Sequence, residues 1–204
     1  MASKLIILLC VTLSIYTNFL FFCSAAETPN PVLDFVGTKV RTGVPYHIIT
    51  STIDPPGGGM MSDCTYDNTT CPIEVMKNIR GLPMYFSPVN PKKGIIREST
   101  DLNIIFWYTK DVWKVDRKLD ESSQKYFVTN GGGVVGNPGP QTLDNWFKFE
   151  KYEDGYKIVH CPSVCRYCKV MCKDVGIFEQ NGKVVLALSN EPIKILLKEH
   201  YIDD

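Results

Sequence analysis

Four cysteines are crowded into one short segment of the chain. Cys161, Cys165, Cys168 and Cys172 lie within twelve residues, separated by three, two and three others. Two nested disulfides fit this spacing, Cys161 with Cys172 outside and Cys165 with Cys168 inside, because a tight turn brings the inner Cα atoms within bonding distance. The alternative is a four-cysteine zinc site, which usually has two CxxC pairs with a longer spacer between them.

The same segment is basic. Arg166, Lys169 and Lys173 are its charged residues, and no acidic residue precedes Asp174. Residues 161–173 are called the stapled loop from here on. Disulfides need no accompanying run of cations, so we interpret the loop as an interaction surface. The alternative is that the charges only keep an exposed loop soluble.

The N-terminal residues indicate an oxidising compartment. A basic start at Lys4 is followed by an uncharged apolar run over 5–22 and by small residues up to Ala26. This pattern predicts a secretory signal peptide over 1–26 and a single secreted domain over 27–204, in the extracellular space or the vacuole. An uncleaved membrane anchor is the alternative. Disulfides persist in oxidising compartments, which favours nested disulfides over zinc.

Six cysteines remain in the predicted domain, an even number that permits complete pairing. When the stapled loop has used four of them, Cys64 and Cys71 are left, and we expect these two to pair with each other. The sequence Asn68-Thr-Thr70 lies between them and is an N-glycosylation sequon. We therefore predict a glycan on Asn68, in an exposed loop.

The charges of the chain balance, with 22 basic and 22 acidic residues. Nucleic acids and anionic membranes attract proteins that carry a strong positive excess, and this chain has none. We expect neither a nucleic acid nor, once the signal peptide is removed, a membrane as a partner.

No arrangement typical of an enzyme or a metal site stands out in the sequence. His47, His160 and His200 are not spaced as metal ligands, and the GxSxG motif of a serine nucleophile is absent. The aspartates between residues 101 and 120, Asp101 among them, are interpreted as solvated strand ends rather than as the carboxylate pair of a glycosidase. We expect no catalytic activity, no cofactor and no metal.

Short segments rich in β-branched and aromatic residues alternate with clusters of Pro, Gly, Asn and Asp, and no segment sustains a helical period. The predicted strands span residues 32–35, 46–50, 95–97, 102–107, 113–115, 126–129, 146–152, 156–160, 176–179, 184–188 and 193–197. So many short strands in one domain predict an all-β sandwich or closed barrel.

Two segments have the composition of hairpin turns. Glu153-Asp-Gly155 and Gln180-Asn-Gly182 each end in a glycine that can supply a positive φ. The segments 55–59 and 130–140 are rich in Gly and Pro and are predicted to be loops.

Several motifs of the chain resemble, in order, those of the plant Kunitz inhibitors of the soybean trypsin inhibitor type. They are Val32-Leu-Asp34 with Gly37, Val40 and Tyr46-His-Ile48; Cys71-Pro-Ile-Glu-Val75; Gly81-Leu-Pro-Met-Tyr-Phe-Ser-Pro88; Asn145-Trp-Phe-Lys-Phe-Glu150; Tyr156-Lys-Ile-Val-His-Cys-Pro162; and Asp174-Val-Gly-Ile177. The resemblance covers nearly all of residues 27–204. It implies a β-trefoil of twelve short strands in three four-stranded units, and it implies the function of a secreted protease inhibitor.

The chain departs from the family pattern at three places. The family's reactive loop follows the Ser-Pro matched by Ser87-Pro88, and there this chain has Asn90-Pro91 in place of an Arg or Lys. Thr42 matches an asparagine that supports this loop in the family. The family's first long-range disulfide joins the cysteine matching Cys71 to one in the region of 105–112, where this chain has no cysteine.

These departures leave two candidate inhibitory loops. One is the family's usual loop, with Asn90 as it stands, or with Lys92 or Lys93 if the loop is shifted. The other is the stapled loop, in which we rank Lys173 and Lys169 equally and Arg166 after them.

The resemblance implies a secreted peptidase as the partner, of serine type and including serine carboxypeptidases, bound by a monomer of this chain. A cysteine protease is the alternative target. A rigid loop that offers a basic side chain to an acidic pocket inhibits because it orders little on binding and dissociates slowly. The alternative function is a non-inhibitory trefoil with a storage, carbohydrate-binding or signalling role.

Overall fold

Strands make up nearly all the regular structure in the computed structural model, which describes residues 28–52, 57–62 and 71–201. The strands are β1 (Tyr46–Thr50), β2 (Gly58–Ser62), β3 (Cys71–Met76), β4 (Met84–Pro88), β5 (Leu102–Phe106), β6 (Lys114–Val115), β7 (Val128–Asn130), β8 (Lys148–Tyr152), β9 (Gly155–His160), β10 (Lys173–Gln180), β11 (Lys183–Ser189) and β12 (Ile195–Glu199). Two 3-10 helices, η1 (Pro91–Lys93) and η2 (Leu143–Asn145), complete the described elements.

Six strands close into a barrel. Antiparallel pairing runs from β1 to β4, β5, β8, β9 and β12, and β12 pairs with β1 again over five residue pairs. The contact between β5 and the residue before β8 is a single bridge from Leu102 to Phe147. Each barrel strand is thereby connected to a neighbour on both sides.

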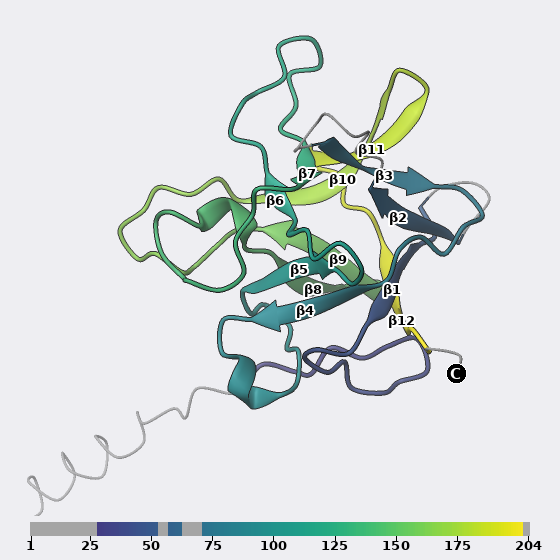
Figure 1. Ribbon diagram of the computed structural model, residues 1–204, viewed down its shortest axis with the longest axis vertical. Helices are drawn as coiled ribbons and strands as arrows, with labels where there is room; N and C mark the ends of the chain where they lie inside the picture. Colours follow the sequence, from purple (N-terminus) through teal and green to yellow (C-terminus); the bar gives the residue numbers. More distant parts are fainter. Residues whose placement is uncertain (1–27, 53–56, 63–70, 202–204) are drawn as a thin grey trace, which may run out of the picture.

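Three hairpins lie over one end of the barrel, where Figure 1 draws them above the barrel strands. They are β2–β3, β6–β7 and β10–β11, and they join one another through β3–β11, β3–β7 and a bridge from Phe127 to Ala187. Each hairpin follows one barrel strand and precedes the next. The chain is therefore divided into the units β1–β4, β5–β8 and β9–β12, which confirms the all-β class and the β-trefoil.

Aromatic side chains fill the interior. The largest fully buried ones include Trp113, Phe86, Phe106, Phe147 and Phe149, which come from separate segments of the chain and pack through edge-on and tilted ring contacts. Burying such side chains is the main favourable term in folding. The alternation along β8, with Phe149 buried between two partly exposed neighbours, is the half-buried pattern expected from the sequence.

Two predicted strands are wrong. Residues 32–35 and 95–97 form only isolated bridges, Pro31 with Arg97, Leu33 with Lys39, and Arg41 with Ile95. The first segment is turned aside by Asp34, whose Oδ1 accepts hydrogen bonds from the backbone N–H groups of Val36 and Thr38. Such a side-chain acceptor competes with a strand ladder for the backbone donors.

One glycine-rich segment that was predicted to be a loop is partly a strand. Gly58 and Gly59 begin β2, where they pair with Thr50 and Ile49. A Cβ on Gly59 would lie 2.1 Å from the carbonyl carbon of Arg80, so only glycine lets the two backbones approach this closely.

The two predicted hairpin turns differ in how they use glycine. Asn181 and Gly182 both have positive φ, 52° and 76°, as the prediction requires. In the other turn the positive φ belongs to Glu153, at 50°, and Gly155 is already in β9. A Cβ on Gly155 would lie 2.5 Å from the carbonyl oxygen of Ile195, so this glycine permits a close approach instead.

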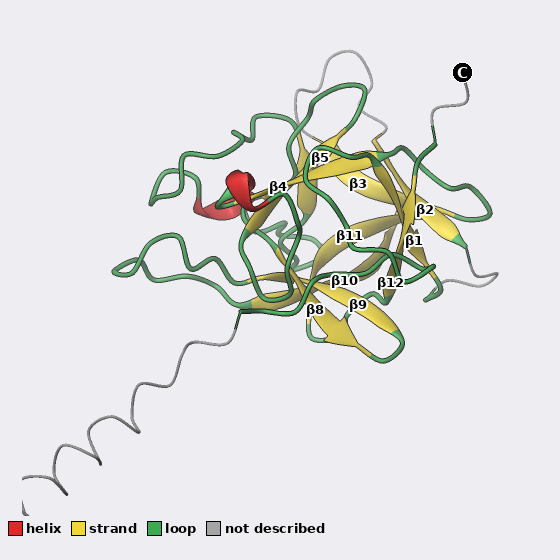
Figure 2. Ribbon diagram, turned by 90° about the horizontal axis from the view of Figure 1, so that it is seen from below, coloured by secondary structure: helices red, strands yellow, loops and turns green. Residues whose placement is uncertain are grey.

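The two candidate inhibitory loops have different places in the fold. The stapled loop joins the barrel strand β9 to the hairpin strand β10 and projects to the left in Figures 1 and 2. The loop with Asn90 joins β4 to β5 and contains η1.

Candidate functional site

The stapled loop is closed by two nested disulfides, Cys161–Cys172 and Cys165–Cys168. Cys161 follows directly on β9, and Cys172 directly precedes β10. The outer disulfide therefore closes the loop where the pairing of His160 with Lys173 ends the ladder between the two strands. Among the described residues, no group of three or more His, Cys, Asp or Glu side chains could hold a metal ion.

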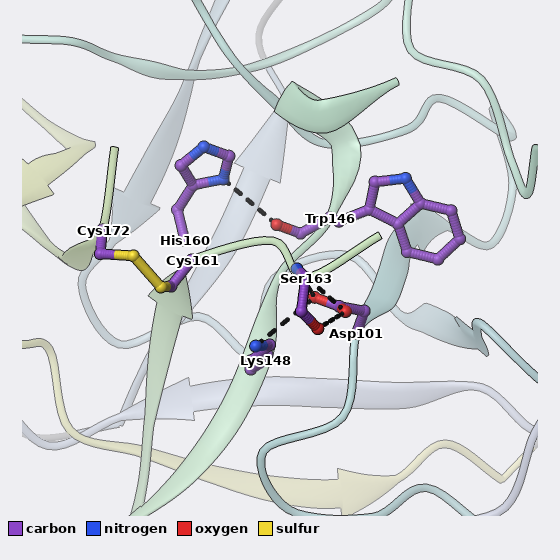
Figure 3. Close-up of a disulfide and its surroundings, with 7 residues drawn as sticks. All are labelled: Asp101, Trp146, Lys148, His160, Cys161, Ser163 and Cys172. Carbon is purple, nitrogen blue, oxygen red and sulfur yellow. Dashed lines mark hydrogen bonds and ion pairs between the residues drawn. A yellow bond between two sulfur atoms is a disulfide. The ribbon is translucent and has the colours of Figure 1, made fainter. Parts of the chain in front are cut away.

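A buried carboxylate fixes the first half of the loop (Figure 3). Both carboxylate oxygens of Asp101 accept from the backbone N–H of Ser163, at 3.2 and 3.1 Å, and the Ser163 hydroxyl donates to Oδ2. Lys148 places its ammonium 3.8 Å from Oδ1. Asp101 is only 5% exposed, so the interpretation of this residue as a solvated strand end is wrong. Hydrogen bonds to a charged group are among the stronger ones in proteins.

Asp101 also holds the other candidate loop. Its backbone carbonyl accepts from the N–H of Val89, at 2.8 Å, directly before Asn90. The side chain of Asp101 thus fixes the stapled loop while its backbone fixes the entry to η1.

The base of the stapled loop is fixed by buried groups. Burial lowers the pKa of His160 below its ordinary 6.5, an effect larger than the opposing one of the Trp146 carbonyl. The neutral imidazole can donate from Nδ1 to that carbonyl, 3.1 Å away (Figure 3). Pro162 and Cys165 are buried as well. The base of the loop is therefore part of the folded body.

The tip of the loop is exposed. Arg166 and Tyr167 occupy the turn that the inner disulfide encloses, and the Tyr167 side chain is 83% exposed. The guanidinium of Arg166 makes no ion pair or hydrogen bond with the part of the chain that the structure describes. Lys169 and Met171 are exposed in the second half of the loop.

The second half of the loop borders a cavity. Lys169, Val170 and Met171 line this cavity of about 320 Å³, and Arg117 and Asp144, which form an ion pair, line it as well.

Lys173 belongs to a strand rather than to the loop tip. It is the first residue of β10, and its ammonium donates to the side-chain oxygen of Asn190. The following Asp174 pairs with Lys157 at 2.9 Å, and this contact raises the pKa of the lysine. The sequence places three cations in one loop, and the structure separates Lys173 from the other two.

The loop that carries Asn90 is helical and exposed. Pro91, Lys92 and Lys93 form η1, and Gly94 ends it with a φ of 68°. The Thr42 backbone N–H donates to the Gly94 carbonyl at 3.1 Å, but the buried Thr42 hydroxyl has no hydrogen-bond partner among the described residues. The support that the resemblance assigns to this side chain is not made here.

Two predicted features lie outside the described residues. Cys71 is disulfide-bonded, but its predicted partner Cys64 is not among the described residues. The predicted glycan acceptor Asn68 also lies outside them. The pairing of Cys64 with Cys71 and the glycan both stay predictions.

One cluster was not foreseen from the sequence. The Nε2 of His47 lies 3.0 Å from Nδ1 of His200, and the Tyr108 hydroxyl is 3.5 Å from the other nitrogen of His200. The two histidines are 153 residues apart. Only the closure of the barrel by β1 and β12 brings them together, so no spacing in the sequence could have indicated the pair.

Taken together, the closed barrel, its cap of hairpins and the rigid loop between β9 and β10 define a β-trefoil that presents a braced loop to solvent. The family model described as "trypsin and protease inhibitor", of the legume Kunitz type, matches residues 32–199. The chain thus belongs to the plant Kunitz-type family of protease inhibitors, and it is miraculin-like within that family. The description of the family names protease inhibition, which is a binding function and not catalysis.

Individual relatives agree with this assignment. The chain is 47% identical to miraculin of Synsepalum dulcificum, covering 83% of each chain, and 43% identical to Kunitz trypsin inhibitor 5 of Arabidopsis thaliana, covering 84% of this chain and 86% of that one. Among solved structures, the Kunitz-type cysteine protease inhibitor PCPI-3 from potato is 31% identical, with a TM-score of 0.73, over 86% of this chain and all of that one.

Proposed function

We propose that this chain is a secreted, non-catalytic inhibitor of a serine-type peptidase, either an endopeptidase or a serine carboxypeptidase, and that it acts as a monomer. The family to which it belongs supports inhibition. The pattern of residues 1–26 supports secretion, with removal of that segment. Among the described residues, no helix is long and apolar enough to cross a membrane.

The stapled loop is the proposed contact with the peptidase. We choose this loop because its backbone is fixed while Arg166 stays exposed. The outer disulfide joins the two ends of the loop, and the Asp101–Ser163 hydrogen bonds fix its first half. A loop that is already ordered loses little conformational entropy on binding and dissociates slowly.

The loop with Asn90 is less suited to this role. It contains no cysteine, so no disulfide closes it, and its residues Pro91, Lys92 and Lys93 form an exposed 3-10 turn. Among the described residues, the Thr42 hydroxyl makes no hydrogen bond that could support this loop. Pro91 would also follow Asn90 at the bond offered for cleavage, without an N–H to donate.

Two multiple variants decide between the loops. Inhibition of chymotrypsin, trypsin, subtilisin and a serine carboxypeptidase is measured for residues 27–204, for R166A/K169A/K173A and for K92A/K93A. We expect the natural sequence to inhibit at least one enzyme and the triple variant to inhibit it at least about 100-fold more weakly, as for the loss of central interface residues. The K92A/K93A variant is expected to match the natural sequence.

Full inhibition by the triple variant, or no inhibition of any of the four enzymes by the natural sequence, would contradict the proposal. The thermal unfolding temperature of each variant is measured as a control, because it distinguishes a lost contact with the peptidase from a loss of the folded structure.

A further inference from the structure

We infer that Tyr167, rather than any of the lysines, is the side chain that enters the specificity pocket of the peptidase, with Arg166 pairing with an acidic group at the rim of that pocket. This inference rests on the proposed function and names the residue that determines its specificity. The sequence alone points to the charged residues of the loop, and Tyr167 is uncharged.

Tyr167 is unusually exposed for its size. Its side chain is 83% exposed, compared with 69% for Tyr201 and 64% for Tyr108, the next most exposed large apolar residues that the structure describes. Tyrosine gives a large contact area and has only two side-chain torsions to order, and it is enriched with arginine among the residues that dominate binding energies.

The inner disulfide constrains the backbone beneath Tyr167. It lies within the four-residue ring that Cys165 and Cys168 close, and Cys165 is itself only 8% exposed. Two residues earlier than that cysteine, Ser163 is bound to the buried Asp101. The ring therefore projects the tyrosine from a fixed base, which lowers the entropic cost of inserting it into a partner.

The lysines of the loop are less available. The Lys173 ammonium is bonded to Asn190 and its backbone is paired in β10. Lys169 is exposed, but it lies outside the inner ring, beside the cavity that Arg117 and Asp144 also line. Arg166 and Tyr167 are the two side chains that the inner ring turns outward.

The turn also determines how the loop can bind. Residues 166 and 167 form a tight turn and cannot lie extended across a catalytic nucleophile as a substrate does. Tyr167 then blocks the pocket as a wedge, and the peptide bonds on either side of it are expected to stay uncut.

The chemistry of the loop indicates the chemistry of its partner. An aromatic ring fits an apolar slot of the chymotrypsin kind better than a trypsin pocket, which has an aspartate at its base. No acidic residue lies between Cys161 and Lys173, so a partner with a carboxylate beside the slot is attracted rather than repelled.

The test uses the enzyme of the four-member panel that the natural sequence inhibits most strongly. We expect Y167A to inhibit it at least about 30-fold more weakly and Y167F to stay within about threefold, because the ring rather than the hydroxyl fills the slot. Y167K should shift the preference from chymotrypsin toward trypsin. Mass spectrometry after prolonged incubation should find residues 161–173 intact.

Inhibition by Y167A within about threefold of the natural sequence would overturn the inference, as would a natural preference for trypsin over chymotrypsin. If Y167A inhibits fully while R166A/K169A/K173A does not, the proposed function stands and only the role of Tyr167 falls. If both variants inhibit fully, the stapled loop is not the contact. Unchanged thermal unfolding of Y167A, whose side chain points to solvent, excludes a folding defect.

Discussion

Asp101 shows how one residue can position two loops. Its buried carboxylate accepts from Ser163 at the base of the stapled loop, and its carbonyl accepts from Val89 at the entry to η1. The side-chain contact can be removed without touching the backbone contact. A substitution at Asp101 therefore separates the effect on the stapled loop from the effect on the loop with Asn90.

We predict that D101N lowers the free energy of unfolding by about 2 kcal/mol, because hydrogen bonds to a charged group are lost and the new amide N–H₂ faces the donors of Ser163 and Lys148. Urea denaturation measures this loss. Hydrogen exchange should also speed up in residues 163–171 and stay unchanged in 90–94. E179Q, at an exposed position of β10, is the matched control. Equal stability of D101N and E179Q would show that the carboxylate is not a brace.

At the scale of the element, the stapled loop was largely predictable. The spacing of its four cysteines limits the pairings that can form without strain, and the nested pairing is the one observed. The position of each cation was not predictable, because it depends on where β10 begins. Lys173 is in that strand and bonded to Asn190, a residue distant in sequence.

The two disulfides should contribute separately. Closing the outer ring removes about 3 kcal/mol of unfolded-state entropy and closing the inner ring about 2 kcal/mol. We expect C161A/C172A to be the less stable double variant in urea denaturation. We expect C165A/C168A to keep the fold but to weaken inhibition at least about tenfold, since the tip then has to be ordered on binding. Undiminished inhibition by C165A/C168A would show that the inner ring does not preorganise the tip.

For the whole molecule, the sequence predicts the all-β class better than it predicts how β1 and β12 close the barrel. The alternation of apolar and charged residues predicts β8, and the β-branched and aromatic residues of β1 and β9 predict strands that are buried at most positions. Neither signal predicts β2, where Gly59 is needed for a close backbone approach, or the pairing of β1 with β12 across the entire chain. The β-trefoil followed from the resemblance, not from the strand count.

Burial of two histidines predicts how stability depends on pH. The pKa values of His47 and His160 are both lowered from 6.5, mainly by burial, and for His47 also by His200. Below about pH 6.5 the unfolded chain therefore binds protons that the folded chain excludes, and the free energy of unfolding falls as the pH falls. Above that pH these two residues have no effect.

Urea midpoints between about pH 7.5 and pH 5.5 test this dependence, which is at most about 1.4 kcal/mol per group and pH unit. The H47Q/H160Q variant should show a flatter dependence than the natural sequence. Identical slopes for the two proteins would assign the pH dependence to other groups.

Hydrogen exchange of this chain, free and bound to the panel peptidase that it inhibits most strongly, tests whether the stapled loop contacts the peptidase and the loop with Asn90 does not. We predict that exchange in residues 163–171 slows at least about tenfold on binding, while exchange in residues 90–94 is unchanged. Protection of 90–94 with no protection of 163–171 would contradict the account.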